Sequence, residues 1–465
     1  MKLRTPIVLT VAAALTALAP AAAARPTPGS TLSNAAAALR NGNLAATHGV
    51  VDGCRVVIAH QTVNLGCQHS LVTIAKGSAT PMATTTPTGY GPAELARAFN
   101  LPATGGSTNN VSIVGVGAYP TLEADLTHYR SQYGLPACTT ANGCLKIVDY
   151  HGGPPLTPNA SLASVEESYA TETALDVQLA SAACPTCTIT MVQIPMNLLE
   201  LLLAATLGLP GALASDFGTA VNEAVSLGAK AVSMSYGLPT GLQGSLLGTG
   251  APAQALHHPG VAIVASSGDS GYTGSTQIWP QELPWVTSAG GITLTSADAG
   301  QTFTKSAWGG QFTSSDGTTS FVGAGSGCAL DLPAAVGQPA AVAANCNGHR
   351  AISDVSADAD PHTGVAVYDT YTPDSGTGGG WLVVGGTSAA SPYLAGLYAR
   401  AGTTGVDGPN TMYSAPAGSI EDIVGGTNAQ NGAADCTQFT AATCTGVTGW
   451  DGPTGVGVPS GLAAF

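Results

Sequence analysis

The sequence has little positive charge. Thirteen Lys and Arg residues stand against 27 Asp and Glu among 465 residues, which gives a formal net charge of −14. Binding to nucleic acid or to an anionic membrane needs clustered cations that neutralise phosphate groups. The sequence therefore argues against both partners. Charged residues of either sign make up only 9% of the chain and hydrophobic residues 44%, which excludes a charge-rich disordered protein.

Periodic and long apolar segments are also missing. The 61 Gly and 30 Pro residues follow no Gly-X-Y period, which excludes collagen. The most apolar internal stretch, residues 197–214, is interrupted by Glu200, Gly208 and Pro210, so no internal membrane span is expected. Few carboxylates also means few groups whose protonation would unfold the chain, so an acidic working environment is allowed.

The first residues have the order of a secretory signal peptide. Lys2 and Arg4 precede an apolar run over residues 7–18, and the small residues 22–24 follow. The run is too short to span a bilayer. We therefore interpret residues 1–24 as a signal peptide cut after Ala24, and expect a secreted, extracellular protein that has no membrane contact after signal removal.

Ten cysteines follow the predicted signal peptide, an even number that favours disulfides in an exported chain. Neighbours along the chain are the natural partners, although sequence does not fix the connectivity. Cys184-Pro-Thr-Cys187 could instead be half of a zinc site or a redox motif, but no second CxxC or His pair completes a zinc site. The neighbouring pairs are Cys54 and Cys67, Cys138 and Cys144, Cys184 and Cys187, Cys328 and Cys346, and Cys436 and Cys444.

The composition and the hydrophobic pattern of the chain change near residue 89. Residues 25–88 are rich in Ala, Thr and Pro and end in a linker-like stretch over 79–87, with a short apolar patch around Cys54 and Cys67. Residues 89–465 alternate between strand-like and helix-like blocks, which predicts βαβ units and a parallel sheet with helices on both faces. Expected strands are residues 111–116, 188–192, 229–234 and 261–265, and an expected helix is 122–133.

A serine stands on a glycine-rich turn before a helical pattern. Gly385-Gly386-Thr387-Ser388 opens an apolar block that runs to Ala399. A hydroxyl in this position suits a nucleophile, and its own N–H can face a developing oxyanion. The same turn could simply cap the helix.

The usual base for such a serine is histidine, but none of the nine histidines lies in a suitable sequence setting. The sequence offers Glu172 and Asp176 instead, four residues apart in a helical pattern and thus on one helix face. Such a pair is most often a solvated face, yet this one borders an apolar face. A further carboxyl, Asp269, follows the expected strand 261–265, where parallel sheets place their ligands. An Asx turn is the alternative interpretation for Asp269.

Three motifs in this order resemble the sedolisin family of serine-carboxyl peptidases. They are Glu172-x-x-Leu175-Asp176, Ser267-Gly268-Asp269-Ser270-Gly271 and Gly386-Thr387-Ser388-Ala389-x-x-Pro392. The resemblance runs from about Tyr90 to the C-terminus and includes residues 233–237 and 354–361. It implies a subtilisin-like α/β fold behind a short N-terminal segment. It also implies that Ser388 is the nucleophile, Glu172 its base, Asp176 the residue that orients Glu172, and Asp269 a protonated oxyanion donor.

The resemblance also implies a calcium ion near the C-terminus. Asp422 and Asp451 would supply carboxylates, and Ile423, Val447 and Gly449 would supply carbonyl oxygens, which are the ligands a hard cation prefers. Val447 departs from the glycine that the family has there. Residues 25–88 are too few for the long prodomain of the family, so a maturation cut near the linker stays open.

We therefore expect a monomeric, acid-active, serine-type endopeptidase that hydrolyses proteins or peptides. A tripeptidyl aminopeptidase of the same family, a catalytically idle calcium-stabilised binding protein and an ordinary subtilisin with an unrecognised histidine remain as alternatives. The sequence does not determine side-chain specificity or the natural substrate.

Overall fold

The computed structural model describes residues 50–58, 61–64, 66–73, 81–103, 106–313, 319–372 and 379–465. The predicted signal peptide, residues 1–24, lies outside the described residues, as does the part of the 25–88 segment before residue 50.

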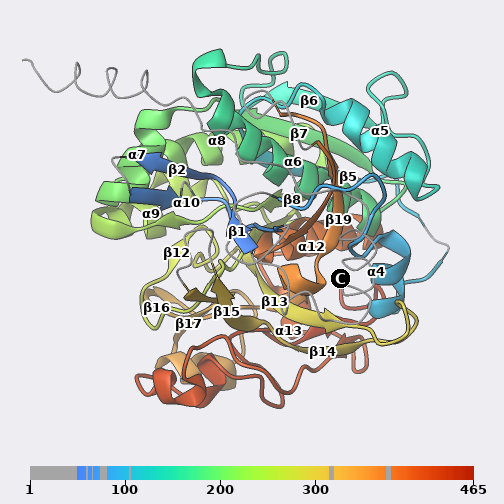
Figure 1. The fold of residues 1–465 in the computed structure, drawn as a ribbon. Helices are drawn as coiled ribbons and strands as arrows, with labels where there is room; N and C mark the ends of the chain where they lie inside the picture. The colour runs from blue at the N-terminus through green and yellow to red at the C-terminus, as the bar shows by residue number, and fades with distance from the viewer. Residues whose placement is uncertain are drawn as a thin grey trace, which may run out of the picture.

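A central sheet of eight strands organises the molecule (Figure 1). Every pairing within it is parallel except that of the edge strand β14, which runs antiparallel to β13. The mostly parallel sheet confirms the sequence prediction, and four of its strands are those expected from apolar runs. In spatial order the strands are β14 (Thr304–Ala307), β13 (Thr287–Thr295), β10 (Ala262–Ser266), β8 (Ala229–Met234), β5 (Asn110–Val116), β7 (Thr188–Ile194) and β6 (Leu145–Asp149), with β18 (Val355–Asp358) also paired to β13.

Helices cover both faces of this sheet because its side chains alternate between two apolar cores. Val111 and Ile113 of β5 face one core, whereas Val114 and Val116 face the other. The first core contains residues of α4 (Pro92–Ala98), α5 (Leu122–Gln132), α6 (Ala163–Ala183) and α12 (Thr387–Ala401). The second contains residues of α7 (Leu198–Leu207), α8 (Gly211–Ser226), α9 (Gly244–Thr249) and α10 (Ala251–Gln254). In Figure 1, α7 to α10 lie to the left of the sheet and α4 and α5 to its right.

Smaller sheets surround the central one. A four-stranded sheet joins the N-terminal segment to the strand before α12, in the order β1 (Val50–Asp52), β4 (Ser70–Val72), β20 (Gly380–Gly385) and β19 (Val365–Asp369). A second has β11 (Ser270–Tyr272), β16 (Thr319–Pro333), β15 (Gly309–Thr313) and β17 (His349–Ile352). Three pairs complete the strands: β2 (Arg55–Ile58) with β3 (Gln61–Asn64), β9 (Leu238–Pro239) with β12 (Ile278–Trp279), and β21 (Ile420–Glu421) with β22 (Val458–Pro459).

Short helical turns connect these elements. Two are α-helical, α11 (Ala340–Ala343) and α13 (Asn410–Tyr413). The others are 3-10 turns: η1 (Ala160–Leu162), η2 (Gly241–Gln243), η3 (Ala344–Cys346), η4 (Pro361–Thr363), η5 (Gly432–Cys436) and η6 (Ala441–Thr443).

All ten cysteines form disulfides, and each pairs with its neighbour along the chain as predicted. Cys184 and Cys187 are therefore a structural cystine at the end of α6. The Cys54–Cys67 bridge closes a loop inside the N-terminal segment.

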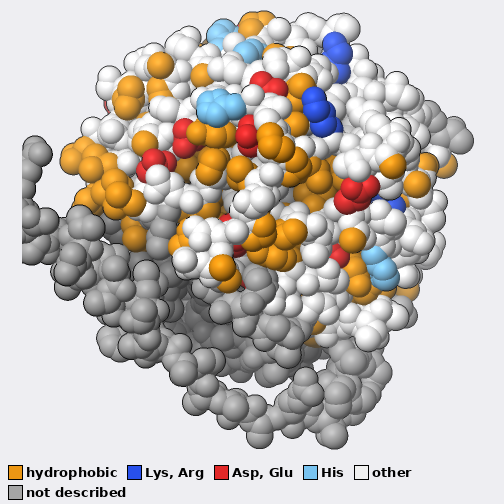
Figure 2. Space-filling view, turned by 90° about the horizontal axis from the view of Figure 1, so that it is seen from above, with side chains coloured by type: hydrophobic (Ala, Val, Ile, Leu, Met, Phe, Trp, Pro, Cys, Tyr) orange, Lys and Arg blue, Asp and Glu red, His pale blue; other side chains and the backbone are white. Residues whose placement is uncertain are grey.

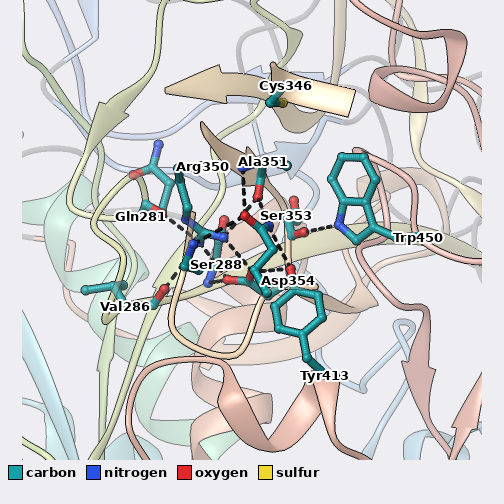
Figure 3. A network of polar contacts seen from close by, with 12 residues as sticks. Gln281, Val286, Ser288, Cys346, Arg350, Ala351, Ser353, Asp354, Tyr413 and Trp450 are labelled. Atoms are coloured by element: carbon teal, nitrogen blue, oxygen red, sulfur yellow. Dashed lines mark hydrogen bonds and ion pairs between the residues drawn. The ribbon is translucent and has the colours of Figure 1, made fainter. Parts of the chain in front are cut away.

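A buried ion pair joins β17 to the residue directly before β18 (Figure 3). Arg350 donates two hydrogen bonds to Asp354, of 2.6 and 2.7 Å, and both side chains are fully buried. Tyr413 donates to Asp354 from α13, and the Ser288 N–H donates from β13. The pair thus joins elements that lie far apart in the sequence.

The surface carries few charges, as the composition requires. In the face seen in Figure 2, acidic and basic side chains are scattered among uncharged ones. Among the helices that the structure describes, none combines the length and the apolar character needed to cross a bilayer.

Candidate functional site

Gly386 forms the turn between β20 and α12, directly before the start of the helix. Gly386 has φ of 102°, a left-handed conformation that suits glycine. A Cβ at Gly386 would lie 2.3 Å from the carbonyl oxygen of Gln68 and 2.5 Å from Asp269 Oδ2. Both oxygens therefore converge on the space that this glycine leaves open. Ser388, the second residue of α12, lies beside it and is fully buried.

Helix α6 carries both predicted carboxylates on the face toward α12. Glu172 and Asp176 are one turn apart and fully buried. Burial raises the pKa of Glu172 to about 8, although the Ser388 hydroxyl and a backbone group of Gln68 lower it in part. Burial also raises the pKa of Asp176 well above its usual range, and the nearby charge of Glu172 raises it further. The two groups therefore titrate as a pair.

Ser235, at the end of β8, connects this pair to the nucleophile turn. Its Oγ donates to Asp176 Oδ1 at 2.6 Å and lies 3.4 Å from the Ser388 carbonyl oxygen. Pro392 has no N–H to reach back to that carbonyl, which leaves it open to Ser235. The Ser388 hydroxyl lies 3.4 Å from the Ser235 carbonyl oxygen. The same hydroxyl lies near enough to Glu172 to lower the pKa of that carboxyl.

Asp269 lies between β10 and β11, at the carboxyl end of a central strand as predicted. Its Oδ1 accepts hydrogen bonds from the N–H and the hydroxyl of Thr387, of 2.8 and 2.9 Å. These bonds fix the carboxyl against the first residue of α12. The four residues singled out in the sequence, Glu172, Asp176, Asp269 and Ser388, are therefore gathered around one turn, and the roles assigned to them stay predictions.

A histidine that the sequence analysis did not identify stands in this site. His69 Nδ1 lies 2.6 Å from Glu172 Oε2, and both side chains are fully buried. The sequence analysis found no histidine in a suitable sequence setting, so the contact of His69 with Glu172 was not predicted. The pairing of β4 with β20 brings His69 there from 103 residues away, and no local pattern signals that contact.

The Cys54–Cys67 bridge lies in the same place. Four potential metal-ligand atoms lie within 4.8 Å of one another here: the two sulfurs of the bridge, a ring nitrogen of His69 and a carboxyl oxygen of Glu172. Because the two sulfurs are bonded to each other, they are not thiolates and do not form a metal site.

Residues 66–68 run alongside residues 235–237, the stretch of chain that directly follows β8. The Gln68 N–H donates to the Ser235 carbonyl, and the Gly237 N–H donates to the Gly66 carbonyl. Cys67 and Tyr236 form an antiparallel bridge between them. This is the main-chain pairing of an added β-strand.

This added strand ends at the nucleophile. The carbonyl oxygen of Gln68 accepts the Ser388 N–H at 2.9 Å. The side chain of Gln68 turns back, so that its Oε1 accepts the Asp269 N–H at 3.0 Å. A cavity of about 310 Å³ opens beside Gln68, and its apolar lining includes Leu201, Leu213, Leu238 and Ile278.

The predicted calcium residues come together at the C-terminal loops. Asp422 Oδ2 accepts the Gly449 N–H, and Asp451 Oδ2 accepts the Val447 N–H. Burial raises the pKa of Asp451 to about 7, and the charge of Asp422 adds to that rise. The carbonyl oxygens of Ile423, Val447 and Gly449 accept no hydrogen bond from the residues that the structure describes.

Two characterised peptidases share sequence with the chain. Kumamolisin from Bacillus sp. (strain MN-32) is 27% identical over 395 residues, which cover 81% of this chain and 63% of the relative. Sedolisin from Pseudomonas sp. (strain 101) is 30% identical over 216 residues, which cover 43% of this chain and 33% of the relative. The chain thus spans less than two thirds of the length of either relative. No protein-family model matches it.

The fold agrees with these relatives. The structure of Pseudomonas sedolisin, a serine-carboxyl proteinase, in complex with pseudo-iodotyrostatin superposes with a TM-score of 0.59 at 22% identity. The match covers 81% of this chain and 96% of that one. The subtilisin-like α/β fold predicted from the sequence is therefore confirmed. Together with the shared motifs, these likenesses support the assignment of the chain to the sedolisin family.

Proposed function

We propose that this protein is a secreted, acid-active serine endopeptidase that hydrolyses proteins and peptides. The observation that carries the proposal is the burial of two carboxylates, Glu172 and Asp176, beside a serine on a glycine turn. A purely structural helix gains nothing from burying two acids one turn apart. A binding protein that had lost catalysis would not need to keep all four positions.

The residues divide the chemistry among them. Ser388 attacks the carbonyl carbon of the peptide bond while Glu172 takes its proton, and Glu172 later gives that proton to the leaving amine. Asp176 orients Glu172 and shares a proton with it, since two neighbouring carboxyl groups do not readily ionise together. The oxyanion receives the Ser388 N–H and the protonated carboxyl of Asp269, since an ionised carboxylate donates no hydrogen bond.

Endopeptidase activity is favoured by what precedes residues 66–68 in the chain. Three residues, Gly66, Cys67 and Gln68, reach from Gly237 to Ser388, and a further strand, β3, precedes them in the sequence. A tripeptidyl aminopeptidase needs a cleft that is closed after three residues. A cleft that admits a longer chain supports cleavage inside a polypeptide.

The rate of hydrolysis is expected to peak in acid. Activity rises with pH as Glu172 ionises and falls as Asp269 loses the proton that it donates. The pKa of about 8 for Glu172 applies to the site with residues 66–69 in place, and we expect this pKa to fall when solvent enters the cleft, because burial is its main cause. The measurement is a pH–rate profile on a denatured protein. A maximum at about pH 7 or above would contradict the proposal.

We also propose that Ca²⁺ binds between the two C-terminal loops. Asp422 and Asp451 would hold it with the carbonyls of Ile423, Val447 and Gly449. The fit rests on these unused carbonyl oxygens and on Asp451, whose buried carboxyl gains from a nearby cation. A bound ion would fasten the last loop to β21 and so stabilise the fold.

Removing calcium is expected to lower the melting temperature. Excess chelator should lower it relative to saturating Ca²⁺, since an ion that binds only the folded state stabilises it by mass action. Asp422→Asn should lower the melting temperature in Ca²⁺ and remove most of the chelator effect. Asp435→Asn is a matched control, because Asp435 is exposed in η5, bonds to Asn431 and is no proposed ligand. An unchanged melting temperature with chelator would refute the site.

A further inference from the structure

A second cavity adjoins the one beside Gln68. Its volume is about 610 Å³, and its walls come from α9, from residues on both sides of β12 and from the end of β16. These elements lie together at the left of Figure 1. The two cavities meet along β9 and β12, since Pro239 and Ile278 line the first and Thr240 and Gln277 line the second. The second has the volume of a small-molecule site, far more than the roughly 30 Å³ of one water molecule.

A buried carboxyl group without a partner lines this second cavity. Glu282 follows β12, and its side chain is among those that form the wall, yet the residue is only 7% exposed. Among the residues that the structure describes, none donates a hydrogen bond to Glu282 or forms an ion pair with it. A carboxyl group that is removed from water without a partner costs free energy. Glu282 is therefore a group that gains from binding a ligand in the cavity.

The charges around Glu282 favour a cation as that ligand. Burial and the nearby charge of Asp331 on β16 raise the pKa of Glu282 to about 7, although Arg350 on β17 lowers it in part. Arg350 donates to both carboxyl oxygens of Asp354, so its own ion pair is with a different residue. The described residues that line the cavity include Glu282 and Asp331 but no Lys, Arg or His. A bound cation would therefore meet two acidic groups and no competing positive charge.

Other lining groups suit a cation that ends an aliphatic chain. Gln277 donates through Nε2 to residues 273 and 274, and no described residue donates to its Oε1. This oxygen and the Glu282 carboxyl can both accept, and an ammonium group has three N–H donors and no acceptor. Methylene groups that lead to such a charged head pack against apolar surface. The end of β16 supplies that surface through Ala329, Leu330 and Leu332.

We propose that this cavity binds a primary alkylammonium group, with Glu282 as its anionic partner at the buried end and Asp331 at the exposed rim. A free aliphatic amine and the lysine side chain of a polypeptide both carry this group. A metal ion fits less well, because a hard cation such as Ca²⁺ takes six to eight oxygen ligands and does not use an apolar wall. The proposal does not depend on the peptidase function, since the residues assigned to catalysis take no part in it.

Binding of the ammonium group should weaken in acid. The cation pairs with ionised Glu282, whose pKa is about 7 before binding. Above that pH the carboxylate is already ionised, whereas below it binding must first remove a proton, so the affinity falls by up to about tenfold per pH unit. The charged groups that act on Glu282 are Asp331 and Arg350, and neither α9 nor residues 275–281 contain another. The site should therefore fill at neutral pH and empty in acid.

Calorimetric titration of n-butylamine into the full-length Ser388→Ala protein tests the proposal, with n-butanol as the uncharged control. We expect one amine to bind per chain at about pH 8, and its affinity to fall at least about tenfold at about pH 5. The alcohol should bind far more weakly, because it lacks the charge. N-acetyl-lysine amide is titrated in parallel. Tighter binding of this compound than of n-butylamine assigns the ligand to a polypeptide, the reverse order assigns it to a free amine, and either order supports the site.

Three variants locate the binding. Glu282→Gln should weaken amine binding at least about tenfold and remove its pH dependence, because an amide carries no charge and does not titrate. Asp331→Asn, at the exposed rim, should weaken it only a few-fold, since solvent screens that charge. Asp435→Asn is the matched control and should bind like the parent, because Asp435 is exposed in η5 and does not line the cavity. The melting temperature of Glu282→Gln without amine should not fall, which shows that the variant is folded.

Several results would overturn the site. Amine binding that is unchanged in both Glu282→Gln and Asp331→Asn would place the ligand elsewhere. Equal affinity for n-butylamine and n-butanol would show an apolar cavity without charge pairing. Binding of Ca²⁺ that Glu282→Gln removes, in a protein that binds no amine, would assign the cavity to a metal ion. None of these results bears on peptide hydrolysis, so the proposed function would stand in each case.

Discussion

The Ser388→Ala variant is expected to lose at least about 10⁴-fold of its kcat on a denatured protein in acid, because no other group supplies the nucleophile. Glu172→Gln should cause a loss of similar size, since an amide cannot accept the proton of the hydroxyl. The double variant should be no worse than either single variant, because groups that act as one unit have non-additive effects. Initial rates at saturating substrate measure all three.

Ser391→Ala is the matched control for this experiment. Ser391 lies one turn further along α12, is equally buried, and has its Oγ 2.9 Å from that of Ser233. Its loss should cost about 1 kcal/mol of stability and leave the rate within a few-fold of wild type. Equal activity of the wild type and the Ser388→Ala protein would refute the proposed function.

Arg350→Met is expected to destabilise the folded protein by about 3–5 kcal/mol, because it leaves Asp354 buried without its cation. Tyr413 and the Ser288 N–H still donate to that carboxylate but carry no charge. The carbonyls of Gln281 and Val286 also lose their shared donor. Guanidinium unfolding in the Ser388→Ala background, where self-digestion is absent, measures the change in free energy.

Two further variants show whether the buried charge is the cause. Arg97→Met removes an arginine whose side chain is 39% exposed and pairs with Glu94, so it should cost less than about 1 kcal/mol. Adding Asp354→Leu to Arg350→Met should recover part of the loss, because no unpaired charge is then buried. A loss for Arg350→Met no larger than that for Arg97→Met would contradict this account.

Local features of the site could be predicted because they follow from short-range geometry. A spacing of four residues in a helical pattern puts Glu172 and Asp176 on one face whatever surrounds the helix. The glycine turn before Ser388 and the strand before Asp269 are likewise contained in a few consecutive residues. The disulfides followed from the same logic, since each joins neighbours along the chain.

Other features depend on contacts that no local pattern contains. Arg350 and Asp354 are four residues apart but not in a helix, and Asp354 lies in the short connection between β17 and β18, so no helical spacing predicts their contact. The burial of Glu172 and Asp176 could not be read from the sequence either. It follows from the packing of α6 against α12, which turns an ordinary acidic face into a coupled pair with raised pKa values.

The sequence by itself determined which residues are available for the chemistry, because residue type and helical or strand period are properties of the local chain. Only the tertiary structure decided which other groups of the chain contact these residues. His69 and Gln68 reach the site through the pairing of β4 with β20, a register between strands some 300 residues apart. That register is set by the packing of the whole fold.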